Sequence, residues 1–307
     1  LRFQKTAMTY FKHMDETMKS KQSPENERVP EKPQAESSEQ RPNKKIIFGK
    51  QILQHRVMYA LYTISAILII WFIFTDLTGL IPQLFLPGPV KVSSTFVSLL
   101  EEGYRDYSLY YHVGISMMRV LLAFLAACAI GIPVGLLMAL NKHVEFLIDP
   151  IIELYRPIPP IALIPLFIIW LGIGELSKIG IIFIAIFAVM VINTVAGVKA
   201  MSQTKIWVAQ TLGAKGRGLF WHVTLPGAFP SIFTGMRVGI GFGWTTLVAA
   251  EMIAAKSGIG WMALNARRFL RTDIIICGVL LMGITGLLID RLLRVIELYL
   301  VPWKGKE

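Results

Sequence analysis

Few residues in this sequence have both the type and the spacing that chemistry requires. A glycine-rich run, GMRVGIGFG from Gly235 to Gly243, is the closest approach to a phosphate-binding loop. In such a loop backbone amides turn toward phosphate and a lysine follows, whereas Trp244 and Thr245 follow here. The run lies inside an apolar segment, and Gly239 and Gly243 stand one helical turn apart, which is typical of close helix packing. Any nucleotide that this protein requires must therefore be bound by another chain.

The other reactive side chains are isolated from one another. His112 and His222 form no metal-binding set, and Cys128 and Cys277 lie inside apolar runs without the spacing of a metal site or a disulfide framework. No paired carboxylates and no Ser/His arrangement stand at a shared depth. The sequence therefore predicts no catalytic residue, no metal site and no cofactor bound by this chain.

Charged side chains inside apolar segments are the remaining candidates for function. Glu251 lies near the end of an apolar run that begins at about Ile232. A carboxylate is costly in lipid, so it is expected to face a cavity or a partner. We predict that Glu251, with Trp244 and Thr245 in the same run, lines a pathway or forms a gate. Two alternatives stay open for Glu251, which are a place at the outer membrane boundary and a structural pair with an arginine.

Four further charged residues stand at the starts of apolar segments. Asp149, Glu153 and Arg156 precede or open one of them, and Arg237 lies one turn into another. The first three could pair with each other, contact a neighbouring loop or lie among lipid headgroups. Arg237 fits a basic anchor at the membrane surface, and contact with a substrate anion is the alternative.

The apolar composition indicates what positions these residues. The chain has 307 residues, of which 54% are hydrophobic and 17% are charged, against about 25% charged in soluble domains. A membrane span needs about 20 mostly apolar residues. Six segments approach or meet this length and predict an all-α polytopic membrane protein with about six transmembrane helices; they are residues 57–75, 116–140, 151–172, 179–198, 232–254 and 274–293.

The third segment differs from the others because prolines interrupt it in the run RPIPPIALIP. A proline inside a helix removes a backbone hydrogen bond, and the freed carbonyls are tolerated at membrane depth only against other helices or a water-filled cavity. This segment is therefore expected to pack inside the bundle or to begin the third span as a broken helix.

Charge and composition set the expected orientation. Residues 1–50 are polar and predict a disordered cytoplasmic extension, and residues 51–307 form the transmembrane domain. Lys50 and Arg56 precede the first span, which places the N-terminus in the cytoplasm. Most basic residues then fall in inside loops, at 141–150, 199–231 and 294–307, which explains the net charge of +11 without nucleic-acid binding. The outside loop 255–273 fits less well, because four of its residues are basic.

The inside loop 199–231 is long and patterned. It reads KAMSQTKIWVAQTLGAKGRGLFWHVTLPGAFPS, which predicts a short helix ending near Gly213 and a second amphipathic stretch ended by Pro226. Its spacing resembles the signature loop of ATP-binding-cassette import permeases, EAA, three residues, G, nine residues, then I-x-LP. Trp207 stands where that pattern has Glu. The residues that match or adjoin the pattern are Ala209, Gly213, Ala214, Val223, Leu225 and Pro226.

The resemblance extends from about residue 57 to 305. It is carried by DPIIELYRPIPPIALIPLFIIWLGIGELSKI (149–179), QTLGA (210–214), LPGAFPSIFTGMRVGIGFGWTTLVAAEMIAA (225–255), GIGWM (258–262) and PWKG (302–305). These segments are similar to the sulfonate, nitrate and taurine branch of binding-protein-dependent import permeases, and most of all to its taurine permeases. The resemblance implies a type I importer fold in the inner or plasma membrane of a bacterium.

The same resemblance implies a set of partners. Two permease subunits, commonly identical, would form the pore, and two cytoplasmic ATPase subunits would bind ATP and Mg and dock on the loop 199–231. An extracytoplasmic binding protein would deliver the substrate. The chain itself would be a non-catalytic permease embedded in membrane lipid.

The resemblance also implies a small anionic substrate, taurine or another alkanesulfonate. Importers of nitrate, bicarbonate or a pyrimidine precursor are alternatives within the branch. The outer basic residues would attract an anion or dock an acidic face of the binding protein; they are Lys256, Arg267, Arg268 and Arg271. An autonomous secondary transporter is a rival from another class, although the chain lacks an evident internal repeat and has few intramembrane charges.

Overall fold

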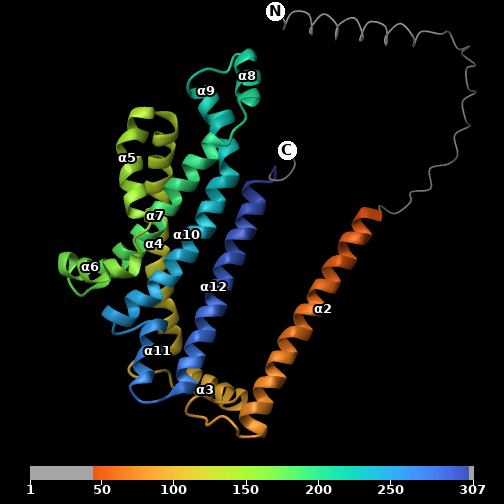
Figure 1. Ribbon diagram of the computed structural model, residues 1–307, viewed down its shortest axis with the longest axis vertical. Helices are drawn as coiled ribbons and strands as arrows, with labels where there is room; N and C mark the ends of the chain where they lie inside the picture. The colour runs from red at the N-terminus through yellow and green to blue at the C-terminus, as the bar shows by residue number, and fades with distance from the viewer. Residues whose placement is uncertain (1–43, 304–307) are drawn as a thin grey trace, which may run out of the picture. The chain divides into compact units, whose positions relative to one another are not determined.

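The computed structural model describes the backbone of residues 44–303 and the side chains of residues 58–303 except residue 254. The chain divides into two units, residues 1–61 and 62–307, and all contacts below lie within the second. Within the described residues every regular element is a helix (Figure 1); these are α2 (Lys44–Phe72), η1 (Ile73–Leu77), α3 (Pro89–Glu101), α4 (Leu109–Leu140), α5 (Lys142–Tyr155), η2 (Pro160–Leu163), α6 (Ile164–Leu171), α7 (Glu175–Lys199), α8 (Gln203–Thr211), α9 (Arg217–Leu219), η3 (Phe220–Thr224), α10 (Leu225–Ala254), α11 (Ile259–Arg267) and α12 (Thr272–Leu300).

The helices of spanning length confirm the predicted class. Four are long and apolar enough by themselves to cross a membrane, and they are Met58–Leu77, Leu109–Leu140, Glu175–Lys199 and Thr272–Leu300. A bent pair, Lys142–Tyr155 with Pro160–Leu171, gives a fifth. The 30-residue helix α10 is less apolar than these helices. At 1.5 Å per residue it is about 45 Å long, which exceeds the ~30 Å hydrocarbon core.

Several predicted boundaries are corrected by the structure. Residues 1–43 of the expected extension lie outside the described residues, and residues 44–50 begin α2. The expected loop 141–150 is almost entirely the first part of α5, because the Asn141 side chain caps that helix by accepting a hydrogen bond from the His143 amide at 2.9 Å. The second span begins earlier than expected, at Leu109, where Ser108 caps α4.

The third span is broken, as the prolines predicted. The chain bends by 91° between α5 and the η2–α6 segment. Pro157, Pro159 and Pro160 fall at this bend, where they remove backbone donors and disfavour the helical conformation of the residues before them. The bend places non-helical backbone beside the middle of α7.

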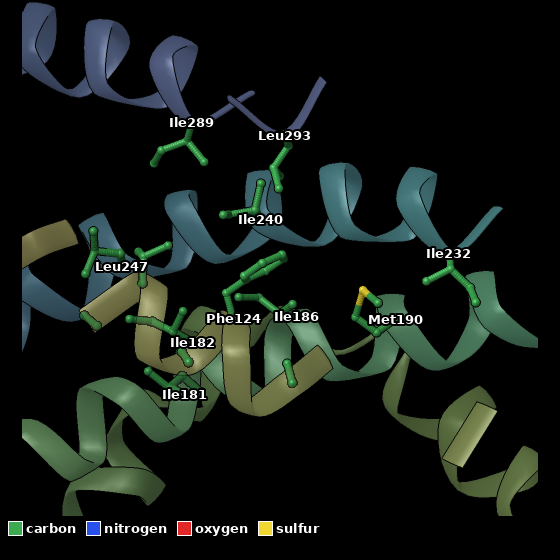
Figure 2. Packing of buried hydrophobic residues seen from close by; sticks show 14 of the residues in the cluster. Phe124, Ile181, Ile182, Ile186, Met190, Ile232, Ile240, Leu247, Ile289 and Leu293 are labelled. Carbon is green, nitrogen blue, oxygen red and sulfur yellow. The ribbon is translucent and has the colours of Figure 1, made fainter. Parts of the chain in front are cut away.

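The core lies between α4, α7, α10 and α12. Figure 2 shows Phe124 of α4 and Ile186 of α7 close together, with Ile240 of α10 between them and the α12 residues Ile289 and Leu293. The most extensive contacts join α7 to α4 and to α10. Thus α7 is the central helix, and its neighbours must approach it closely.

Glycines allow α4 and α10 to lie close to α7. This confirms the prediction that the glycine run 235–243 serves helix packing. A Cβ at Gly243 would lie 2.5 Å from Ile186 Cδ1, and one at Gly239 would lie 3.1 Å from Ile186 Cγ2. Gly135 of α4 meets Thr194 in the same manner, with its Cβ position 2.6 Å from Thr194 Cβ. Small residues therefore place both α4 and α10 against α7.

Candidate functional site

The segment from α7 into α10 contains the six residues that match or adjoin the signature pattern; four of them precede α10, and Leu225 and Pro226 begin it. Its first helix, α8, begins after Ser202, whose hydroxyl accepts a hydrogen bond from the Lys205 amide at 3.4 Å. This satisfies one of the amides that the first turn of a helix leaves unpaired. In Figure 1, α8 and α9 lie together at one end of α7 and α10, and α11 lies at the other end.

Three of the predicted residues form the end of α8. The Ala214 amide donates to the Ala209 carbonyl at 2.9 Å, and the Gly213 amide donates to the Gln210 carbonyl at 3.0 Å. These two bonds define a Schellman motif, which requires a left-handed residue at its penultimate position. Gly213 supplies it with φ of 92°. Nothing lies within 4 Å of a Cβ built at Gly213, so its backbone conformation, rather than space, requires glycine.

The second half of the loop is wrongly predicted. Pro226 does not end a helix, because α9, η3 and α10 follow one another without a break and Pro226 lies in the first turn of α10. The preceding turn is a π-helix containing Val223, in which the Leu225 amide bonds to the Phe220 carbonyl. A proline lacks the donor that a helix interior needs, and the change from π to α geometry lets the chain continue through it.

The surface of this loop is apolar and basic. Its most exposed large side chains are Trp207, Val208, Leu212 and Trp221, and Leu212 is 83% exposed. Lys215 and Arg217 are exposed beside them. Exposed apolar groups of this size, rimmed by charge, are typical of protein interaction surfaces. The coupling role of the six matched residues stays a prediction.

Glu251 occupies a different environment, at the far end of α10. Its side chain is completely buried, and its Oε1 accepts hydrogen bonds from Arg119 Nη1 at 2.6 Å and from Ser116 Oγ at 2.7 Å. Its Oε2 accepts from the Gly260 amide at 2.9 Å. Of the alternatives left open by the sequence, the structure contains the pair with an arginine.

Arg119 connects this carboxylate to α7 and to the segment that follows α10. Its guanidinium donates two bonds to Glu175, from Nε at 2.6 Å and from Nη2 at 2.8 Å, and a third to the Ser257 carbonyl at 2.9 Å. Lys178 donates to Glu175 at 2.8 Å. Two cations and two anions therefore balance one another in one cluster, which we name the Arg119 cluster (Arg119, Glu175, Lys178 and Glu251).

Neighbouring groups hold the turn between α10 and α11 on this cluster. The Ile259 amide donates to Ser116 Oγ at 3.0 Å, and the Gly258 amide donates to His112 Nδ1 at 3.1 Å. Since Nδ1 accepts, the other ring nitrogen, Nε2, carries the proton that it shares with the Tyr104 carbonyl at 3.2 Å. Gly258 has φ of 121°, and any Cβ there would overlap the Glu251 carboxyl group.

The other predicted pathway residues do not join Glu251. Trp244 is half-buried and donates to the Met282 carbonyl of α12 at 3.2 Å, while Thr245 is exposed and bonds to the Phe242 carbonyl at 2.9 Å. Arg119 was missed by the sequence reasoning, although it is the only Asp, Glu, Lys or Arg between residues 109 and 140. That isolation within a span was the signal that a partner had to be sought.

A separate group of side chains lies around α11, in the segment expected as the loop 255–273. Arg271 holds Asp273 through bonds of 2.8 to 3.2 Å, and these hydrogen bonds raise the pKa of Arg271. Arg105 stacks 4.4 Å above the Phe269 ring. Burial raises the pKa of the Tyr104 hydroxyl, which donates to Asn265 at 2.9 Å. No group of three metal-ligating side chains occurs within the described part of the chain.

Comparison with known proteins agrees with these features. The family model of the binding-protein-dependent transport system inner membrane component matches residues 131–303. The chain is 44% identical over 255 residues to the taurine transport system permease protein TauC of Escherichia coli, which covers 83% of this chain and 92% of that protein.

Two further relatives are more distant. The chain is 34% identical over 241 residues to the putative aliphatic sulfonates transport permease protein SsuC of Bacillus subtilis, covering 78% of this chain and 86% of SsuC. It is also 34% identical over 260 residues to the nitrate import permease protein NrtB of Synechocystis sp., covering 83% of this chain and 93% of NrtB. The chain therefore belongs to the family of binding-protein-dependent transport system inner membrane components, the membrane permeases of ATP-binding-cassette importers.

Proposed function

We propose that this permease forms the translocation pathway for taurine or another small alkanesulfonate. The observation that carries the proposal is the 44% identity over 83% of the chain to a permease of a taurine transport system. Similarity to two aliphatic sulfonate permeases, from Bacillus subtilis and Escherichia coli, supports the same class of substrate. The substrate would be an anion or a zwitterion with one sulfonate group and a short apolar body.

The cytoplasmic partner would be an ATPase that docks on α8 and α9 and binds ATP and Mg. Two features support this docking surface. The Schellman motif at Gly213 fixes the end of α8, and the exposed apolar side chains beside it, such as Trp207 and Leu212, have no role in the core. Ala209, Ala214, Val223, Leu225 and Pro226 would position the loop, while the ATPase would supply the hydrolytic chemistry.

The remaining partners would act at the membrane and outside it. Two copies of the chain would assemble around a shared pathway, with the N-terminus in the cytoplasm. A binding protein would dock over the α10–α11 end, where Arg267, Arg268 and Lys256 are exposed. Opposite charge on that protein would speed the encounter.

The test is ATPase activity of the reconstituted transporter together with the binding protein encoded beside it. Taurine, longer alkanesulfonates, nitrate and bicarbonate are supplied in turn. Stimulation by taurine or another alkanesulfonate supports the proposal. Stimulation by nitrate or bicarbonate alone contradicts the substrate, and uptake by this chain without any ATPase contradicts the partner.

Nitrate is the second candidate, because the similarity to the nitrate import permease extends over 83% of this chain. The same experiment separates the two substrates. Nitrate has no apolar body, so a series of sulfonates with increasing alkyl length distinguishes the two candidate substrates best.

A further inference from the structure

The break in the third span borders a cavity beside the middle of α7. The cavity has a volume of about 310 Å³ and is bounded by residues from the end of α5, from η2, from α7 and from α10. Ligand sites in proteins commonly measure about 300–1,000 Å³. The volume is therefore sufficient for a small organic molecule.

The position of the cavity agrees with the physics of the broken helix. Tyr155, Arg156, Ile158 and Pro160 contribute to its wall, so the 91° bend itself lines the space. Non-helical backbone at membrane depth is tolerated only where other protein or a water-filled cavity satisfies its polar groups. Helix α7, which has 25 residues, forms the opposite wall from Ala185 to Asn193. Ala185 lies near the centre of this helix, and Asn193 lies in its second half.

One charged group at the bend has unused bonding capacity. Tyr155 contributes to the wall, but its hydroxyl oxygen is buried and does not face the space. The Arg156 side chain is 66% exposed, and its ion pair with Glu153 is long, at 3.9 Å. An arginine prefers an anion with several oxygens.

The rest of the wall is apolar. Ala188 and Val189 of α7, Ile158 at the bend and Phe242 of α10 surround the space, and Phe242 is exposed where the cavity reaches the surface of the chain. An apolar wall gains free energy only from an apolar group of the ligand. Nitrate and bicarbonate have none, whereas an alkanesulfonate has an alkyl chain next to its anionic group.

We infer that this cavity is the binding site for an alkanesulfonate during translocation, with Arg156 at its sulfonate group and Ala188 beside its alkyl chain. The inference rests on the proposed function, because it assigns a place to that substrate. It also predicts a preference among the candidate anions, since the apolar wall favours sulfonates that carry a carbon chain. When the sulfonate binds, Arg156 would replace its long ion pair with Glu153 by a contact with the sulfonate.

The experiment measures uptake and ATPase activity together in proteoliposomes that contain the complete transporter and its binding protein. Arg156→Gln should lower sulfonate uptake about tenfold, as expected for a lost charged hydrogen bond, while binding-protein-stimulated ATPase activity stays within about twofold.

A size variant tests the wall. Ala188→Leu should reduce uptake of butanesulfonate more than uptake of methanesulfonate, since the added side chain occupies the space of the alkyl group. Ala129→Leu, on the exposed face of α4, is the matched control and should leave both unchanged.

The outcomes separate the two proposals. If the unaltered transporter takes up no sulfonate, the proposed function fails. If it takes up sulfonates and both Arg156→Gln and Ala188→Leu match it, the function stands and this site is overturned. Equal loss of uptake and ATPase stimulation in Arg156→Gln would also overturn the site, because it would assign Arg156 to assembly.

Discussion

The Arg119 cluster and the α8–α9 loop reverse the usual distribution of side chains. The cluster holds charges in the interior, with Arg119 only 1% exposed and Glu251 completely buried. The loop holds its large apolar groups outside, with Trp207 62% exposed. Both are stable for opposite reasons. Arg119 bonds to Glu251, which lies 132 positions away in the sequence. The end of α8, by contrast, is fixed by hydrogen bonds between residues no more than five positions apart.

This difference predicts which property each region controls. A buried ion cluster that joins α4, α7 and α10 must affect global unfolding, because removing one partner leaves a charge without compensation. A loop fixed by local caps can change without affecting the core, and its exposed surface matters only to a partner. Variants in the two regions should therefore separate stability from coupling.

The largest effect is expected from Arg119→Met. The variant leaves Glu251 buried with hydroxyl and amide donors but no cation, and about 3–5 kcal/mol of unfolding free energy should be lost. The thermal unfolding midpoint in detergent, followed by tryptophan fluorescence, measures it. Arg268→Met, at an exposed position, is the control. A midpoint for Arg119→Met equal to that of the control would show that the cluster does not stabilise the fold.

A smaller loss is expected from Glu251→Gln. The amide still accepts from Arg119 or Ser116, but its nitrogen cannot accept from the Gly260 amide. Leaving this amide without an acceptor should cost about 1–3 kcal/mol. Adding Arg119→Met to Glu251→Gln should cost less than the sum of the two single changes, because each removes the same ion pair. Strict additivity in unfolding midpoints would argue against the pair.

Local patterns of the sequence predicted the first half of the loop well. The glycine after QTL correctly marked the end of α8, since only a left-handed residue completes that turn. The prolines of RPIPP correctly marked the broken span, and the pair Gly239 and Gly243 correctly marked close packing against α7. Each of these features depends on neighbours within a few residues, which a single sequence displays.

Long-range features could not be predicted in the same way. Glu251 was recognised as unusual, but its partner lies 132 positions away and no local spacing identifies Arg119. Pro226 was wrongly taken as a helix end because a π turn before a proline has no sequence signal. The cavity at Tyr155 and Arg156 required the bend angle between α5 and η2, which proline positions do not specify.

On the loop side of the comparison, Gly213→Asp should affect coupling more than stability. A side chain at φ of 92° costs about 1–2 kcal/mol and unwinds the end of α8. Co-purification of the ATPase should fall several-fold, while the unfolding midpoint of the permease alone stays unchanged. Gly218→Asp adds the same charge to the same loop, at a position without positive φ and with open space around its Cβ. Equal ATPase recovery in both variants would contradict the role of the Schellman turn.

The smallest expected effect belongs to Ser202→Ala, which removes the cap at the start of α8. Loss of one capping bond costs about 1 kcal/mol, so opening of the first turn should become about fivefold more frequent. Hydrogen exchange at the Lys205 amide measures this opening directly, and Ser202→Asn should restore protection because asparagine also caps helices. Amides of α7 near Ile186 should exchange as before, since the core does not depend on the cap. Faster exchange there would mean that loop and core are coupled, and the distinction between the two regions would fail.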